Sequence, residues 1–297
     1  MNIKTITLAA AIMVAGGAAN AVNLVQNGNF ATTSAVNTQF RANYAGGDVV
    51  TGWTGNVAVP YSIGYSGLEG VFYNGTATTV SALNEFNDSR YKLWEAGSGA
   101  GNTFDGTSPN GSNIIALDGD PRFGGGLSQT INGLTAGTTY MVSFYWAAGQ
   151  LQNSNGPTTN RLAVSLGGGE QLAQLSPYLI NSGGESGHQG QLLPGTSTSA
   201  TCLTSTLCLT AQDNVAAEGF TGWQLENINF TATSSSELLS FLSSGTPYGT
   251  PPTALLADVS LNADVPEPAA WALMIVGLGL SGATLRARRG KAITASV

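Results

Sequence analysis

The central part of the chain alternates apolar and polar residues at every second position, and this period constrains its fold more than any other feature. In residues 138–148, Tyr140, Val142, Phe144 and Trp146 share one face, and the intervening residues share the other. Side chains two residues apart lie on the same face of a β-strand. Because no central segment sustains a helical period beyond about two turns, the sequence predicts an all-β domain.

Short strands separated by turns rich in Gly, Ser, Thr and Asn are typical of a β-sandwich or jelly roll. Residues 133–137 form such a turn between a strand expected at 127–131 and the long alternating segment. The other strands are expected at residues 23–25, 56–63, 113–117, 161–166, 223–231, 237–242 and 254–261.

One expected strand carries a break in its alternation. The phase set by Trp223 and Leu225 slips by one before Ile228 and Phe230, which predicts a β-bulge between residues 225 and 228. Core positions are expected for Trp53, Trp146, Trp223 and Phe230.

The C-terminal end has a different pattern. A Pro-Glu-Pro sequence at residues 266–268 precedes 17 residues without a charge, 269–285, and then a basic cluster at 286–291. This apolar run is short for a transmembrane helix, which needs about 20 residues. The basic cluster predicts that the C-terminus stays in the cytoplasm while the rest of the chain lies outside. Residues 265–297 are therefore expected to form a tail with a transmembrane helix at 269–285.

This tail resembles the PEP-CTERM sorting tail of Gram-negative bacteria, in the variant with a Trp-Ala pair after the Pro-Glu-Pro. The resemblance covers about a tenth of the chain. It implies that a membrane protease of the exosortase type cuts near the Pro-Glu-Pro and releases the domain. A plain membrane anchor with a proline-rich hinge is the alternative. The residues that match the sorting pattern are Pro266, Glu267, Pro268, Trp271, Ala272, Met274, Ile275, Gly277, Gly279 and the terminal arginines Arg286, Arg288 and Arg289.

The N-terminal 21 residues have the pattern of a secretory signal peptide. Lys4 precedes an apolar stretch at residues 6–18, and Ala19 and Ala21 form a small-x-small cleavage site. The mature chain is expected to begin near Val22, with an uncleaved anchor as the alternative. Together the two ends predict export through an inner-membrane intermediate to the cell surface, the outer envelope or the medium.

The domain between these ends, residues 22–264, is acidic. It holds five basic and sixteen acidic residues, a net charge of −11. A surface of this sign disfavours contact with a phosphate backbone, so nucleic acid is not an expected partner. The charge is compatible with neutral polymers or divalent cations.

The two cysteines also fit export. Cys202 and Cys208 are separated by five residues, close enough to close a small hairpin loop, and an oxidising compartment favours a disulfide between them. A zinc site would need further ligands that the single histidine, His188, does not readily supply.

Residues 23–30 resemble the opening of galactose-binding-like jelly rolls that often precede this kind of tail. The resemblance spreads over most of residues 22–261, in short pieces. Jelly rolls of this type can hold a structural calcium ion, yet this chain has Ala31 where relatives commonly carry glutamate, and Ala257 with Asp258 where they often have two acids. The pieces that follow in the expected order are residues 52–53, 117–119, 127–130, 140–144 and 256–261.

Calcium needs six to eight oxygen ligands, with several carboxylates among them. Asp118 and Asp120 flank a glycine in one turn, and Asp258 comes close to them if the last strand pairs near the first. These three residues are the candidate metal site. The alternative is an ordinary Asp-Gly turn whose carboxylates bind nearby backbone N–H groups.

The sequence offers little for catalysis. His188 lies in a Gly-rich segment, and no nucleophile elbow, zinc-binding HExxH helix or phosphate loop is present. No catalytic residue and no cofactor are therefore predicted. A pair of carboxylates among the sixteen acids could still hydrolyse a glycosidic bond, so a glycan hydrolase on a jelly roll remains an alternative.

Carbohydrate binding fits the sequence better, because sugar rings stack on aromatic side chains while their hydroxyls bond to polar ones. Arg90, Tyr91 and Trp94 combine both properties and are the candidate ligand-binding residues, although core packing is an equal alternative for Tyr91 and Trp94. A second mixed stretch is residues 60–65 with Tyr73 and Asn74. The sequence thus predicts a non-catalytic module that binds polysaccharide or belongs to an exopolysaccharide or biofilm matrix.

Overall fold

The structure, a computed structural model, describes nine stretches of the chain. By internal contacts the chain divides into two units, residues 23–264 and residues 1–22 with 265–297. The described residues are 22–33, 50–57, 69–79, 92–119, 125–152, 155–167, 200–247, 252–264 and 277–282.

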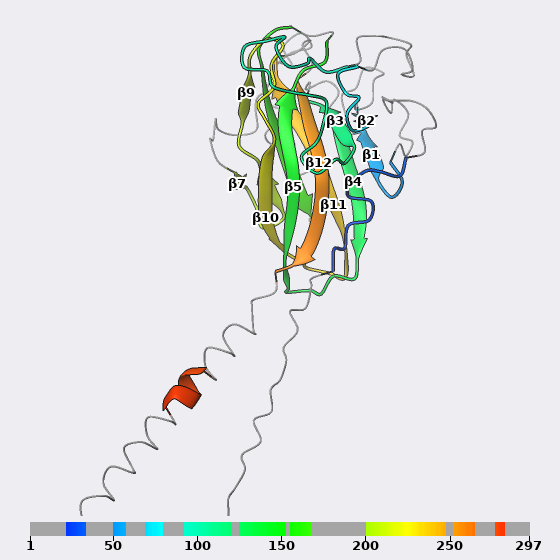
Figure 1. Cartoon of the computed structure of the whole chain (residues 1–297). Coiled ribbons are helices and arrows are strands. Elements are labelled where there is room, and N and C mark those ends of the chain that lie inside the picture. Colours follow the sequence, from blue (N-terminus) through cyan, green and yellow to red (C-terminus); the bar gives the residue numbers. More distant parts are fainter. Residues whose placement is uncertain are drawn as a thin grey trace, which may run out of the picture. The chain divides into compact units, whose positions relative to one another are not determined.

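Residues 23–264 form an all-β sandwich of two antiparallel sheets (Figure 1). The first sheet has five strands in the order β10-β5-β12-β3-β2. Its members are β10 (Gln224–Thr231), β5 (Thr139–Gly149), β12 (Thr253–Ala263), β3 (Ile114–Asp118) and β2 (Glu69–Phe72).

The second sheet has seven strands, in the order β1-β4-β11-β6-β8-β7, with β9 also paired to β6. The three long strands β4, β11 and β6 form its centre. Its members are β1 (Thr54–Val57), β4 (Gly125–Asn132), β11 (Ser236–Thr246), β6 (Thr158–Leu166), β8 (Leu207–Leu209), β7 (Thr201–Cys202) and β9 (Asp213–Val215).

The main core lies between the two sheets and is centred on aromatic side chains. Phe144 of β5 meets Phe241 of β11 edge to face at 5.1 Å between ring centroids, so this contact joins the layers directly. Trp53 lies 6.2 Å from Phe241 and 5.5 Å from Phe30. All four side chains are buried, and each full burial contributes about 2–3 kcal/mol before entropy is counted.

A second, smaller core covers one end of the outer face of the five-stranded sheet. Ala147 of β5 and Leu255 of β12 point outward there, and the loop residues Leu93 and Phe104 pack on them. Trp223 packs against the same cluster, and its indole N–H donates to the carbonyl of Thr107 at 2.9 Å. Both faces of the sheet are therefore apolar at this end.

The N-terminal segment runs beside the far half of β12, although it forms no regular strand. Leu24 N–H donates to Leu261 O, and Val259 N–H donates to Gly28 O, both at 2.9 Å. Gly28 is required there, because a Cβ at this position would stand 1.9 Å from the carbonyl oxygen of Val259. Between Ala257 and Ser260 the register of β12 against β5 shifts in a bulge.

The strand predictions agree with the structure for the long alternating segments, now β5, β6, β11 and β12, and the predicted sandwich class is confirmed. The predicted bulge is wrong. β10 pairs with β5 without a shift from Gln224 to Thr231, so one phase runs through the whole strand. Trp223 and Leu225 lie on the outer face of the sheet. The second core makes this face apolar near Trp223, and these two apolar residues are the reason that a shift in the alternation was predicted.

In the second unit, residues 277–282 are helical, and Ser281 Oγ donates to Gly277 O at 2.7 Å. Among the described residues, no helix has the length and apolar character needed to cross a membrane. Most of the predicted transmembrane segment 269–285 lies outside them.

Candidate functional site

Beyond the second core, the outer face of the five-stranded sheet is open and polar. Leu225 and Tyr145 lie opposite each other in the ladder between β10 and β5, followed by the pair Asn227 and Ser143. Directly opposed residues of an antiparallel pair share a face, so these side chains form rows across the sheet. We call this surface the open face; its residues are Met141, Ser143, Tyr145, Leu225, Asn227, Asn229, Ser260 and Asn262.

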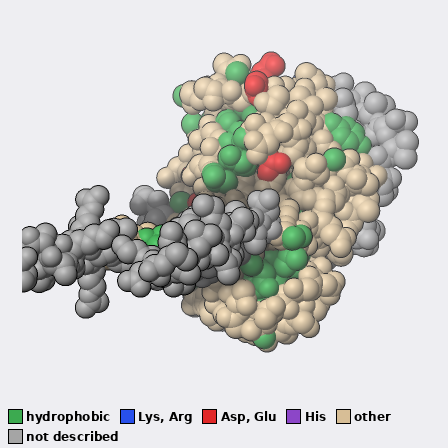
Figure 2. All heavy atoms as spheres, turned by 60° about the horizontal axis from the view of Figure 1, so that its bottom comes forward, with side chains coloured by type: hydrophobic (Ala, Val, Ile, Leu, Met, Phe, Trp, Pro, Cys, Tyr) green, Lys and Arg blue, Asp and Glu red, His purple; other side chains and the backbone are tan. Residues whose placement is uncertain are grey.

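The open face combines an aromatic ring with amides and hydroxyls and carries no formal charge. Leu225 is 52% exposed, Tyr145 is half-buried, and Asn227 and Asn229 are exposed. The core residues of the same strands, such as Val142 and Phe230, point the other way, so a rigid two-layer scaffold supports the face. Figure 2 shows a described surface that is mostly uncharged, with a few acidic side chains and small apolar groups.

The loop that carries Trp94 lies on the same side of the five-stranded sheet as the open face. Leu93 packs on that side in the second core, and Trp94 N–H donates to Gln150 O at 3.1 Å. Trp94 is half-buried. Its predicted companions Arg90 and Tyr91 lie outside the described residues. Residues 60–65 of the second mixed stretch also lie outside them. The other two residues of that stretch, Tyr73 and Asn74, follow β2, and the hydroxyl of Tyr73 shares a hydrogen bond with that of Thr33.

A polar network ties three loops together at this end of the sandwich. Asn102 Nδ2 donates to the carbonyls of Trp94 and Glu218, at 3.2 and 2.7 Å. Gln150 Oε1 accepts from Glu218 N–H, and Gln150 Nε2 donates to Thr158 Oγ1. The network fixes the position of the Trp94 loop relative to β6.

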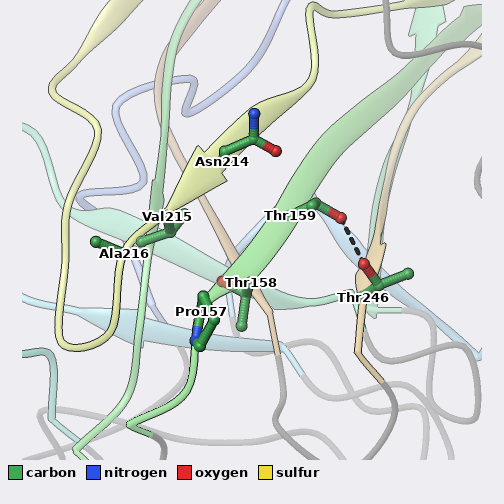
Figure 3. A pocket seen from close by; sticks show the side chains of 7 residues that line it. All are labelled: Pro157, Thr158, Thr159, Asn214, Val215, Ala216 and Thr246. Carbon is green, nitrogen blue, oxygen red and sulfur yellow. Dashed lines mark hydrogen bonds between the residues drawn. The ribbon is translucent and has the colours of Figure 1, made fainter.

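Thr158 also lines an open hollow of about 420 Å³ at the ends of β6, β9 and β11 (Figure 3). Thr159 and Thr246 form a hydrogen bond of 2.8 Å along one side of it. The side chains that line it are small and uncharged, and none is an aromatic ring on which a sugar could stack. The lining residues are Pro157, Thr158, Thr159, Asn214, Val215, Ala216 and Thr246.

Two carboxylates that the sequence did not single out, Asp213 and Glu226, lie at one flank of the sandwich, near enough for the charge of Asp213 to act on Glu226. Asp213 of β9 accepts hydrogen bonds on Oδ2 from Thr221 Oγ1, at 2.7 Å, and from Gln224 Nε2. Burial raises the pKa of Asp213, and these hydrogen bonds oppose the rise. Burial also raises the pKa of Glu226, the nearby indole N–H of Trp146 opposes this rise, and the negative charge of Asp213 adds to it.

The strand pairing separates the predicted calcium ligands. Asp118 ends β3 opposite Thr253, whereas Asp258 lies five residues further along β12 in the bulge, about 16 Å away by strand rise. Asp120 lies outside the described residues. No group of three or more His, Cys, Asp or Glu side chains among the described residues is placed to hold a metal.

The remaining predicted residues divide between the two units. The structure joins Cys202 and Cys208 in a disulfide between β7 and β8, with 2.03 Å between the sulfurs. The signal-cleavage residues Ala19 and Ala21 lie outside the described residues. So do the sorting residues Pro266, Glu267, Pro268, Trp271, Arg286, Arg288 and Arg289.

Comparison with known families identifies the tail. Residues 264–289 match the PEP-CTERM protein-sorting motif, which confirms the resemblance seen in the sequence. This motif implies an exported cell-surface protein that is processed by an exosortase. No curated protein matches the chain.

The chain is similar, at low sequence identity, to several solved structures. A CBM4 structure has 18% identity and a TM-score of 0.27, covering 65% of this chain and 99% of its own. TmCBM61, in complex with β-1,4-galactotriose, has 12% identity and a TM-score of 0.28, covering 82% and 99%. The N-terminal cellulose-binding domain of Cellulomonas fimi β-1,4-glucanase C has 14% identity and a TM-score of 0.27, covering 52% and 82%.

Proposed function

We propose that the protein is an exported, exosortase-sorted module that binds uncharged polysaccharide without cleaving it. The observation that carries the proposal is the open face, where Tyr145 lies among asparagine and serine side chains on a rigid sheet. A sugar ring presents C–H groups to an aromatic ring and hydroxyls to amides. The partner we infer is a neutral chain of the cell's own exopolysaccharide or biofilm matrix.

The geometry of the open face supports an extended ligand. Neighbouring strands are about 4.8 Å apart and alternate residues along a strand about 6.6 Å, so the amides of Asn227, Asn229 and Asn262 are spaced for successive sugar hydroxyls. A polymer that lies across the strands of the open face could continue past β10, because β10 is the edge strand of this sheet. Trp94, and with it Arg90 and Tyr91, would then extend the platform from the adjacent loop.

The tail and the signal peptide supply the delivery in this proposal. The signal peptide is removed after Ala21, the tail holds the exported chain in the inner membrane, and the exosortase cuts near Glu267. Residues 22–264 then act at the surface or in the medium as one domain. The acidic charge of this domain fits a neutral polymer better than an anionic one.

Affinity gel electrophoresis in neutral polysaccharides isolated from the host tests the proposal. We expect wild-type protein to be retarded, and Tyr145→Ala and Trp94→Ala to weaken retention about tenfold, because each removes a stacking ring. Leu238→Ala is the matched control, since Leu238 is exposed (37%) on the outer face of the other sheet. Equal retention of Tyr145→Ala and wild type would refute the open face as the site.

A glycan hydrolase is the second candidate, favoured by the pair Asp213 and Glu226. A protonated carboxyl beside a second carboxylate is what acid-catalysed glycoside cleavage needs, and burial raises the pKa of both groups. Reducing-end release from the same polysaccharides, lost in Glu226→Gln, would establish this activity. Absence of release by wild type, together with retention in the gel, would favour the binding module.

A further inference from the structure

The two carboxylates lie where the sheets approach each other at one flank. β10 is the edge strand of the five-stranded sheet, and β9 is paired to β6 of the other sheet, on the same flank of the sandwich (Figure 1). The hydrogen bond from Gln224 to Asp213 crosses this seam between the sheets. Glu226 lies opposite the core residue Phe144, so its side chain points inward toward the seam.

A third polar side chain at the seam, that of Asn160, has an amide oxygen that accepts no hydrogen bond. Asn160 lies directly opposite Asp213 in the ladder between β6 and β9, and opposed side chains share a face with Cβ atoms about 5 Å apart. The side chain of Asn160 is fully buried at 0% exposure, its Nδ2 donates to Thr158 Oγ1, and its Oδ1 has no hydrogen-bond partner. A buried carbonyl oxygen is normally paired, so this atom indicates a missing partner.

The basic residue next to Asn160 does not supply that partner. Arg161 follows in β6 and points to the opposite face of the strand, where its Nε donates to Thr210 O at 2.9 Å. Leu162, which follows Arg161, lies in the main core. Asn160 is two residues before Leu162, so its side chain lies on the same inward face of β6. Asp213, Glu226 and Asn160 thus point toward the seam from three strands, whereas the side chain of Arg161 points away from it.

We propose that Asp213, Glu226 and Asn160 hold a divalent cation of the calcium type at this seam. Thr221 and Gln224 both bond Oδ2 of Asp213, which orients the carboxylate and leaves its other oxygen as a ligand. Two carboxylates, one amide oxygen and water make a hard, all-oxygen shell, which Ca²⁺ accepts more readily than Mg²⁺ because its geometry is flexible. The site is separate from Asp118 and Asp258, which lie on β3 and in the bulge of β12.

A cation at this position would join the two sheets. It would neutralise the repulsion between Asp213 and Glu226 and give the Asn160 oxygen a partner. With two charged ligands, the affinity is expected in the range of extracellular calcium modules, a Kd of about 0.1–1 mM. The inference does not depend on polysaccharide binding, because the open face lies on the outer side of β10 and the seam on its inner side.

The test is the melting temperature of the full-length chain by circular dichroism, after EDTA treatment and with added CaCl₂. At 10 mM Ca²⁺ we expect a rise of about 3–6 °C at pH 7, a smaller rise with Mg²⁺, and none for Asp213→Asn or Glu226→Gln. Asp258→Asn is the control and should keep the full shift. No shift in wild type, or a shift lost in Asp258→Asn and kept in Asp213→Asn, would overturn the proposal.

A variant that is expected to bind Ca²⁺ more tightly keeps the test decisive if the loss-of-binding variants fold poorly. Asn160→Asp adds a third carboxylate, so it should tighten Ca²⁺ binding at least tenfold while lowering the melting temperature in EDTA. Terbium luminescence gives a direct readout, because Trp146 lies beside Glu226 and its indole can sensitise a bound Tb³⁺ ion. Unchanged Ca²⁺ affinity in folded Asn160→Asp would contradict the assigned ligand set.

Discussion

Replacing Gly28 by alanine tests how the N-terminal segment closes against β12. The added Cβ would stand 1.9 Å from Val259 O, whereas real Cβ contacts stay above 3.0 Å, so the two backbones must separate by about 1 Å. That movement breaks the hydrogen bond from Val259 to Gly28, which is worth about 1 kcal/mol. It also loosens Phe30, which is fully buried, at a cost of about 1–2 kcal/mol.

Together these losses predict that Gly28→Ala lowers the free energy of unfolding by about 2–3 kcal/mol. Urea denaturation of residues 22–264, followed by circular dichroism, measures the change. Gly133→Ala is the control, because Gly133 has φ of +84° and nothing within 4 Å of an added Cβ, so it costs about 1 kcal/mol of backbone strain. A loss in Gly28→Ala no larger than in Gly133→Ala would refute the close approach.

Three further results are expected. Phe241→Ala should lower the free energy of unfolding by about 3–5 kcal/mol in the same assay, because it opens a cavity where the sheets meet; a loss below 1 kcal/mol would contradict the packing. Cys202→Ser with Cys208→Ser should cost about 2 kcal/mol for a disulfide that spans a separation of 6 residues, and an unchanged urea midpoint would count against it. The contribution of Asp213 and Glu226 to the free energy of unfolding, measured as the difference between wild type and Glu226→Gln, should rise as pH falls from neutral to below 4.5, the ordinary pKa of Glu226, because the folded state binds protons more tightly at the raised pKa values of these two groups. That gain disappears as pH rises through the raised values, and a Glu226→Gln profile as steep as wild type would argue against the assignment.

The strands that were predictable are those whose alternation is long. Eleven-residue strands such as β5 and β12 bury every second side chain against the other sheet, so their sequence records the period. The strands β7, β8 and β9 have only two or three residues, too few to show one. Their place follows from pairing with β6 and with each other, which is a tertiary property.

The wrong prediction of a bulge in β10 is the reason that the candidate cation site was not found from the sequence. Apolar residues at Trp223 and Leu225 suggested the inner face, yet the second core makes the outer face apolar at this end of the sheet. Reading the phase backward from Ile228 and Phe230 would have placed Glu226 inside. Its partner Asp213 could not be inferred, because Asp213 reaches the seam through the pairing of β9 with β6.

The open face was predictable in part. The sequence placed Met141, Ser143 and Tyr145 opposite the core residues of β5, and the structure confirms this alternation. Asn227 and Asn229 of β10 and Asn262 of β12 lie beside these residues because β5 is between β10 and β12 in the sheet. No local sequence pattern indicates this strand order. The sequence-based choice of Trp94 instead rested on local composition, and the loop is fixed by contacts distant in the sequence, such as Asn102 with Glu218.

Amide chemical-shift mapping tests the binding claim most directly. Fragments of the host's neutral polysaccharide would be added to isotopically labelled protein of residues 22–264. We expect shifts that cluster at residues 141–145, 225–229 and 260–262 and saturate with ligand. An absence of shifts, or shifts confined to the hollow around Thr158 and Thr246, would contradict it.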